Sequence, residues 1–315
     1  MSETNSRDRL WTKQEMEARL VRYAELRPCL NAFIDTRTPG SETKENFTII
    51  GPGVSENPDQ FVHIAEPHGF NIGAARQPPG CVNSQHSHDT AEVFVAHSGR
   101  WRFDLGENGE DAQVELEPGD VISIPTRIFR GFTNIGEDSG LLWAVLGQDD
   151  PGRVTWAPHV FDMARDYGLL LLDSGQLVDL ARGESIPDGA KPMAPTTEQD
   201  VRKLKRVTPD EAKDFVWKAR PANEIEQLLI GDKAHFAWPH GFILSRLVPP
   251  SGTARAYPSN DPKVLFVHRG TFSVNWDREE LILHPGDTLS IPDGVSHSLT
   301  GMDDDSIAYM VRRSN

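Results

Sequence analysis

Cysteine is scarce in this sequence of 315 residues, which contains only Cys29 and Cys81. Two cysteines offer no disulfide framework, so we expect a reducing compartment, most simply the cytoplasm. Basic side chains are also few, with 32 Lys and Arg against 47 Asp and Glu and a net charge of -15. This balance argues against a nucleic acid or an anionic membrane as partner, because both are bound through basic patches.

Long hydrophobic runs are missing as well. The longest spans about residues 168–172, whereas a membrane-spanning helix needs roughly 20 apolar residues. The first 17 residues are polar and contain no apolar stretch, so we expect no signal peptide. Hydrophobic residues still make up 37% of the chain, which is enough for packed cores, and the length allows two domains.

One short stretch concentrates residue types that bind metals. His86 and His88 are two positions apart, and Glu92 follows at the same parity. Alternate side chains of a strand share one face, so both imidazoles can point the same way. Two neutral imidazoles and one carboxylate suit a divalent first-row metal. With open positions, they are also the ligand set of non-haem Fe(II) oxygenases.

The residues around this group complete a known signature. Residues 80–99 have the form G-x5-H-x-H-x3-E-x6-G, and residues 119–134 follow G-x5-P-x-G-x2-H-x3-N except at two positions. On these two stretches the chain resembles the cupin superfamily. The flanking glycines argue against the alternative, which is two surface histidines beside a solvated glutamate.

Two arginines replace family residues in the second stretch. Arg127 stands at the usual glycine, and Arg130 stands at the usual histidine, which the resemblance implies is normally the fourth metal ligand. Arginine only donates hydrogen bonds, so it cannot ligate a cation. The Arg130 guanidinium either binds a substrate carboxylate or enolate through a bidentate fork and acts with Glu92 in catalysis, or it pairs with Glu92 in a metal-free site. We favour the first interpretation.

Several further residues near the motifs are candidates for contact with a substrate. Besides Arg130 they are Arg127, Gln85, Asn83, Trp101 and Phe103. For the two aromatic residues, packing in the core of the next strand is the alternative.

The first half of the sequence recurs in the second. Residues 63–70, HIAEPHGF, return as residues 235–242, HFAWPHGF. An internal repeat of this kind indicates a duplicated domain, and the chain resembles a bicupin. We expect an all-β fold of two tandem double-stranded β-helix (jelly-roll) barrels with a few flanking α-helices. The expected divisions are an N-terminal helix and loop arm (1–60), a metal-binding cupin (61–150), a helical and linker connection (151–231) and a degenerate cupin (232–315).

The second half lacks the metal ligands of the first. Lys263 stands where the first half has Glu92, and His297 is the histidine of the repeated second signature. An ammonium group would repel a divalent cation, so we expect no metal and no site residues in the C-terminal cupin. An anion pocket or an effector site at Lys263 and His297 is the alternative.

Capping boxes predict helices outside the barrels. Residues 12–15 begin a predicted helix that extends to about residue 27, and residues 208–211 begin another that extends to about residue 220. A third helix is expected near residues 160–167. The apolar stripe of the first helix should pack on a barrel or on a second subunit.

The resemblance leaves three classes of function. The favoured one is a non-haem Fe(II) dioxygenase that acts with O2 on a small anionic phenolic or enolic substrate, as gentisate dioxygenase-like and quercetinase-like bicupins imply. The second uses Zn, Mn or Ni as a Lewis acid in an isomerase, lyase or decarboxylase. The third is a non-enzymatic bicupin that binds a small molecule. We expect one divalent ion per chain and a homo-oligomer, a dimer or tetramer, because exposed jelly-roll edges tend to be covered.

Overall fold

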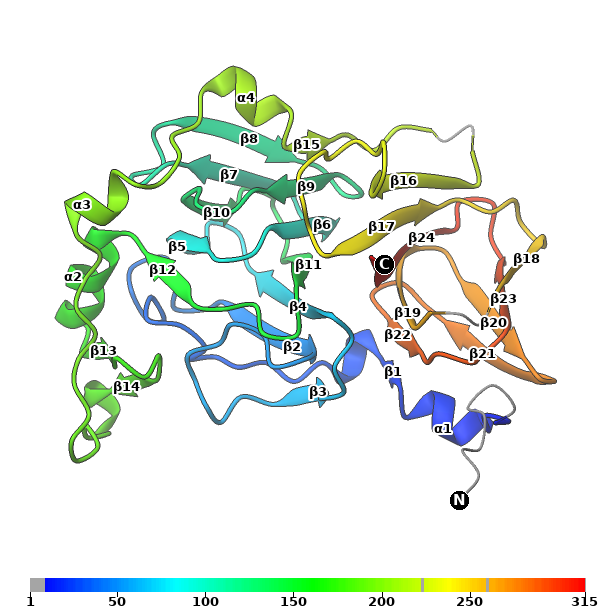
Figure 1. Cartoon of the computed structure of the whole chain (residues 1–315), viewed down its shortest axis with the longest axis horizontal. Coiled ribbons are helices and arrows are strands. Elements are labelled where there is room, and N and C mark those ends of the chain that lie inside the picture. The colour runs from blue at the N-terminus through cyan, green and yellow to red at the C-terminus, as the bar shows by residue number, and fades with distance from the viewer. Residues whose placement is uncertain (1–8, 222–223, 259–260, 315) are drawn as a thin grey trace. The chain divides into compact units, whose positions relative to one another are not determined.

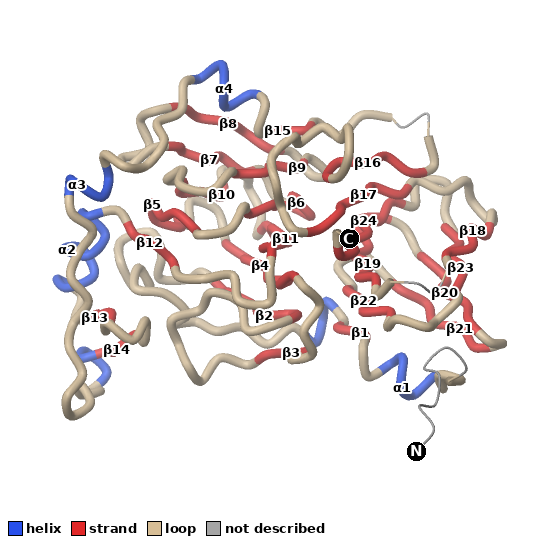
Figure 2. The backbone as a smooth tube through the Cα atoms, in the orientation of Figure 1, coloured by secondary structure: helices blue, strands red, loops and turns tan. Residues whose placement is uncertain are grey.

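The computed structural model describes residues 9–221, 224–258 and 261–314, and strands dominate it (Figure 2). The chain divides into two compact units. Residues 27–219 form the first unit, and the residues up to 26 join those from 220 onward in the second. Each unit contains two β-sheets of the jelly-roll type, so the expected all-β fold of two tandem barrels is confirmed.

The first unit is built on a seven-stranded and a five-stranded sheet (Figure 1). The seven-stranded sheet has the order β15-β9-β6-β11-β4-β2-β3, and the five-stranded sheet has the order β12-β5-β10-β7-β8. The strands are β2 (Glu45–Ile50), β3 (Val62–Ile64), β4 (Phe70–Gln77), β5 (Val82–His88), β6 (Glu92–Ser98), β7 (Trp101–Leu105), β8 (Ala112–Leu116), β9 (Val121–Ile124), β10 (Arg130–Asn134), β11 (Gly140–Gly147), β12 (Val154–Trp156) and β15 (Val216–Trp217).

A short hairpin and short helices complete the first unit. They are β13 (Leu169–Leu171) and β14 (Leu177–Asp179), the helices α2 (Pro158–Asp166), α3 (Glu198–Val201) and α4 (Pro209–Lys213), and the 3-10 helix η3 (Leu180–Arg182). The helix α2 and the hairpin share an apolar cluster with Trp156 at the end of β12. These elements therefore support one wall of the first barrel.

The signature glycines serve the turns between strands. Gly99 lies between β6 and β7 with φ 78°, a left-handed conformation that glycine adopts without a steric penalty. A Cβ atom there would lie 2.7 Å from the Gly140 Cα atom, so any other residue would clash with the neighbouring backbone. Gly99 thus allows the chain to return at once into β7, whose buried side chains Trp101, Phe103 and Leu105 alternate with partly buried ones.

The second unit repeats the arrangement with a six-stranded sheet, β1-β22-β19-β24-β17-β16, and a four-stranded sheet, β18-β23-β20-β21. Its elements are α1 (Lys13–Glu17), β1 (Leu20–Val21), η2 (Tyr23–Glu25), β16 (Glu226–Ile230), β17 (Phe242–Leu247), β18 (Ala254–Tyr257), β19 (Lys263–Arg269), β20 (Phe272–Trp276), β21 (Glu279–Leu283), β22 (Thr288–Ile291), β23 (His297–Gly301) and β24 (Ile307–Arg313). A large apolar cluster fills this barrel, with Phe272, Leu265 and Leu289 among its fully buried members.

The predicted N-terminal helix is much shorter than expected. Thr12 and Glu15 do form the capping box, but α1 ends at Glu17 and the chain becomes strand β1. Leu20 and Val21 pair with Leu289 and Thr288 of β22, and this edge pairing is more favourable than continuing the helix. The apolar stripe does pack on a barrel, because Met16 and Leu20 join the core of the second unit.

The helix predicted to extend to residue 220 is also short. The capping box of Thr208 and Glu211 begins α4, which ends at Lys213. Val216 then pairs with Ile122 of β9, so the chain adds an edge strand to the seven-stranded sheet. None of the helices in the described ranges combines the length and apolar character that crossing a membrane requires.

Candidate metal centre

Two neighbouring strands bring His86, His88 and Glu92 together. Both histidines lie on β5 at alternate positions, and Glu92 begins β6 after a short turn. One ligand atom from each residue can be chosen so that all lie within 4.8 Å of one another. Ligands bound about 2.1 Å from one ion lie at most about 4.2 Å apart, so a small inward movement completes the site. All three side chains are buried.

The two imidazoles are prepared to act as ligands. Burial lowers the pKa of His86 and of His88 well below the usual value, and the nearby positive charge of Arg130 lowers both further. Both rings are therefore neutral at pH 7 and keep a free lone pair. His86 Nδ1 lies 2.7 Å from the Ser84 carbonyl oxygen. It donates its proton there, which leaves Nε2 free to bind a metal.

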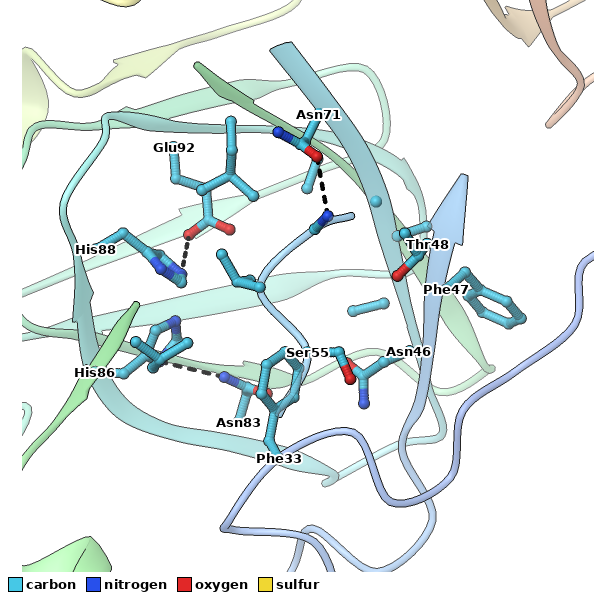
Figure 3. A pocket seen from close by; sticks show the side chains of 18 of the residues that line it. Phe33, Asn46, Phe47, Thr48, Ser55, Asn71, Asn83, His86, His88 and Glu92 are labelled. Atoms are coloured by element: carbon cyan, nitrogen blue, oxygen red, sulfur yellow. Dashed lines mark hydrogen bonds and ion pairs between the residues drawn. The ribbon is translucent and has the colours of Figure 1, made fainter. Parts of the chain in front are cut away.

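The contact between His88 and Glu92 fits a cation between them. His88 Nε2 lies 3.5 Å from Glu92 Oε2 (Figure 3). His88 Nδ1 is buried and has no hydrogen-bond partner among the described residues. A neutral imidazole and a carboxylate facing each other in a buried site gain most from a shared cation, which both can ligate. The donor set thus fits one divalent ion held by His86, His88 and Glu92.

Arg130 lies behind the carboxylate. It begins β10, opposite His86 in the strand pairing. Its Nη2 atom donates to Glu92 Oε2 at 2.5 Å, and the Arg130 side chain is only 1% exposed. Burial raises the pKa of Glu92, whereas the Arg130 charge and hydrogen bond lower it. The guanidinium pairs with Glu92 and is not among the groups that line the cavity described below, so it is not placed to bind a substrate directly.

A cavity opens beside the three candidate ligands, with an empty volume of about 680 Å³ that includes its open mouth. Its polar lining consists mostly of uncharged groups. These are Asn46, Thr48, Ser55, Gln60, Asn71 and Asn83 (Figure 3). Its aromatic lining is Phe33, Phe47, Phe94, Phe132 and Trp156. Of the described residues that line the cavity, none is lysine or arginine.

Besides Arg130, four of the predicted substrate contacts lie outside this cavity. Gln85 precedes His86 on β5 and so points to the opposite face, where its amide is 3.4 Å from the Asp104 carbonyl oxygen. Trp101 and Phe103 are fully buried and pack around Phe132, so core packing, the alternative considered above, describes them. None of these three side chains lines the cavity.

Arg127 is the fourth. It is exposed in the turn before β10 with φ 64°, so the backbone keeps the left-handed conformation that glycine adopts easily at this position. Its carbonyl oxygen accepts a hydrogen bond from the Lys205 amide, and its side chain is not part of the cavity wall. A turn position that projects outward cannot supply a ligand to the barrel interior.

The sequence did not identify Trp156 and Glu56 as parts of the site. Trp156 pairs with His86 across β12 and β5, and the two rings are 5.3 Å apart. The Trp156 Nε1 atom donates to Glu56 Oε1 at 2.6 Å, and the Ile34 amide donates to Glu56 Oε2 at 2.6 Å. The contact of Glu56 with Trp156 spans a sequence separation of 100 residues, so no local pattern could reveal it.

Glu56 should make the stability of this unit depend on pH. Burial raises its pKa from 4.5 to about 8. The folded state thus holds the proton more tightly than the unfolded state, so the stability contributed by protonated Glu56 is complete below about pH 4.5 and is lost as pH rises towards 8. We expect the free energy of unfolding to fall by at least about 1 kcal/mol over this range.

Urea denaturation at several pH values checks this expectation. Glu56→Gln keeps the shape of the side chain and removes its titration, so the pH slope should flatten in this variant. Glu115→Gln, at a half-exposed carboxylate in an ion pair with Arg100, serves as the matched control and should keep the wild-type slope. An equal slope for wild type and Glu56→Gln would contradict the assignment.

The described residues of the second unit bring no comparable ligands together. In the described part of the chain, the group around His86 is the one cluster of three or more potential metal ligands. The Lys263 ammonium donates to the carbonyl oxygens of Pro258 and Asp261, and the His297 ring stacks on Tyr257 at 5.6 Å. Apolar side chains occupy the barrel interior, which leaves Lys263 a role in holding the preceding loop.

Comparisons with known proteins agree with this description. A family model described as Cupin domain matches residues 74–146, the part of the chain that carries the three candidate ligands. Germin-like protein subfamily 1 member 4 of Arabidopsis thaliana is 27% identical over 134 residues. That match covers 40% of this chain and spans only 60% of the relative's own length.

Solved structures of two-barrel proteins are similar over nearly the whole chain. An oxalate decarboxylase of Lactobacillus farciminis, in a formate complex, matches 94% of this chain and 86% of its own at a TM-score of 0.57 and 12% identity. A deletion mutant of Bacillus subtilis oxalate decarboxylase matches 94% of this chain and 76% of its own chain, with a TM-score of 0.54 and 12% identity. Vicilin from hazelnut, Corylus avellana, matches 94% of this chain and 85% of its own chain, with a TM-score of 0.51 and 13% identity. At such identities the similarity establishes the fold alone.

Proposed function

Because this chain is a bicupin, we propose that its first barrel holds one divalent metal ion and that it is a metal-dependent enzyme for a small anionic substrate. The observation that carries the proposal is the convergence of two neutral imidazoles and a carboxylate beside a cavity. The ligand set and its open positions favour Fe(II) and a dioxygenase reaction with O2 on a phenolic or enolic anion.

The charges around the site support an anionic substrate. Glu92 and Arg130 form a buried ion pair, so their charges cancel. A divalent ion held by His86, His88 and Glu92 would then keep an uncompensated charge of about +2, whereas a neutral histidine in place of Arg130 would leave about +1. In a buried cavity whose lining contains no other cation, this excess is the attraction available to a carboxylate or enolate oxygen.

The residues of the cavity suit a small molecule with a flat apolar part. When bound, a divalent ion would supply Lewis-acid polarisation of a substrate oxygen and, in the case of iron, a site for oxygen chemistry. Trp156 and Phe33 meet edge to face with ring centroids 6.0 Å apart and offer surfaces for a ring or enol. The amide nitrogen of Asn46 has no hydrogen-bond partner among the described residues and can orient a substrate oxygen by a hydrogen bond. Burial of the three ligands keeps bulk water away from the reacting groups.

Oxygen uptake after anaerobic loading with Fe(II) tests this proposal. We expect O2 consumption with a carboxylated phenol or enol that depends on iron and is absent after loading with Zn(II). The same wild-type protein loaded with Zn(II) is the matched control for protein and substrate. Turnover that continues without O2 would contradict the dioxygenase reaction.

A second function would use the same donor set, which also accepts Mn, Zn or Ni. Oxalate decarboxylases are among the proteins that share the two-barrel fold. Decarboxylation or isomerisation by the same site with Mn, Zn or Ni would proceed under nitrogen and would release CO2 or an isomer instead of consuming O2. If the wild-type protein binds no divalent ion after reconstitution, both proposed enzymatic reactions are contradicted. The result would then support a protein that binds a small molecule without catalysis.

A further inference from the structure

Two oppositely charged side chains lie fully buried near the first barrel. Lys44 and Asp35 form an ion pair in which both side chains are 0% exposed. Neither residue lines the cavity. Removing two charges from water costs more than their attraction returns unless further hydrogen bonds are made. The further hydrogen-bond partners of Asp35 and Lys44 therefore show what this buried pair holds in place.

The pair makes its other hydrogen bonds to the strand that carries His86. Asp35 Oδ2 accepts from the Ser84 amide at 3.0 Å, and the Lys44 ammonium donates to Asn83 Oδ1 at 3.2 Å. Asn83 and Ser84 both belong to β5, immediately before the first candidate ligand. Each charge thus holds one of two successive residues of β5.

Both residues continue the connection to His86. The Ser84 carbonyl oxygen lies 2.7 Å from His86 Nδ1, and the Asn83 amide nitrogen lies 3.3 Å from the same atom. Because an ammonium group only donates, the Asn83 oxygen must face Lys44 and its NH2 group must face the ring. The Ser84 oxygen is the closer of the two and selects the form of the ring that is protonated on Nδ1. The Asn83 NH2 group is itself a donor, so it makes no hydrogen bond to this protonated nitrogen and only packs beside the ring.

We propose that the Asp35–Lys44 pair is a positioning pair for His86. Asp35 holds Ser84, and Lys44 compensates the buried charge of Asp35, so that the His86 ring stays protonated on Nδ1 and presents Nε2 to the metal. The pair thereby sets the affinity of the centre for a divalent ion. This inference rests on the metal site of the proposed function, but the orientation of the His86 ring can be measured without a metal.

A double variant removes the pair without leaving an unpaired charge. In Asp35→Leu/Lys44→Met, we expect the affinity for Co(II) to fall on the order of 10–100-fold, as it does when groups that orient metal ligands are lost. Nitrogen-15 NMR of the histidines in the metal-free variant should show that His86 loses its uniform protonation on Nδ1. Asp35→Asn/Lys44→Met retains an acceptor for the Ser84 amide, so it should recover the Nδ1 form and lose only several-fold in affinity.

The matched control is Lys218→Met, which removes a lysine from another ion pair of the same unit, at 2.7 Å from Asp120. It should leave both readouts at wild-type values. Wild-type Co(II) affinity together with wild-type protonation of His86 in a folded Asp35→Leu/Lys44→Met variant would overturn the proposal. If that variant does not fold, wild-type affinity in Asp35→Asn/Lys44→Met overturns it instead. A wild-type chain that binds no Co(II) contradicts the proposed function, and the NMR result then decides the positioning role alone.

Discussion

Replacing His86 by alanine should release the divalent ion from the first barrel. His86, His88 and Glu92 are the three side chains that the structure brings together as potential ligands. With one of them removed, the two remaining donors are too few for a tetrahedral or octahedral ion in competition with water. We expect the affinity to fall by more than the roughly 100-fold that the loss of an orienting partner can cost, and metal-dependent activity to disappear with it.

Elemental analysis and Co(II) titration of the purified proteins would measure this loss. His159→Ala is the matched control, because His159 is an exposed histidine on α2, outside the cavity. It should retain about one ion per chain, like the wild type. Stoichiometric metal in His86→Ala at wild-type affinity would show that the ion is bound elsewhere.

Replacing Arg130 by methionine should destabilise the metal-free protein strongly. Its guanidinium donates to Glu92 at 2.5 Å in a site where both side chains are almost fully buried. Removing one partner of a buried ion pair leaves the other charge uncompensated, which typically costs about 3–5 kcal/mol. We expect a decrease of this size in the free energy of unfolding, together with partial recovery when a divalent ion is added to neutralise Glu92.

Denaturation with urea, with and without a metal, would test this expectation. Arg130→Met/Glu92→Gln should recover most of the lost stability, because the double variant leaves no buried charge unpaired. Arg206→Met removes a largely exposed guanidinium from its pair with Asp111 and should cost much less than Arg130→Met, because solvent screens the exposed charge. A stable Arg130→Met protein, or a double variant no better than the single one, would mean that the pair does not hold the site together.

Compartment and assembly remain predictions from the sequence. Both cysteines are free thiols, and burial raises the pKa of each, so neither is activated. The apolar stripe around Met16 is covered within the chain by the core of the second unit. The expected homo-oligomer therefore needs a surface other than this stripe.

The resemblance of the two signatures to cupins and the internal repeat predicted the two barrels, and spacing predicted the three candidate ligands. A strand alternates its side chains, so the parity of His86, His88 and Glu92 places them on one face without knowledge of the rest of the chain. The same rule applied to Gln85 would have excluded it, because it lies next to His86 on β5. The capping boxes at Thr12 and Thr208 likewise depend only on residues within one turn.

Contacts between distant segments determined where the helices end and which charges meet at the site. The helices after Thr12 and Thr208 end early because edge pairing with β22 and β9 replaces them. Arg130 turns to Glu92 because β10 and β6 meet around one barrel, a relation that no local pattern contains.

The Asp35–Lys44 pair could not be predicted from the sequence either. These residues reach β5 from a loop about 40 residues earlier in the chain. Sequence alone therefore determined which residue types could bind a metal. Only the tertiary structure decided which charges accompany them, because burial makes each unpaired charge costly and forces distant partners together.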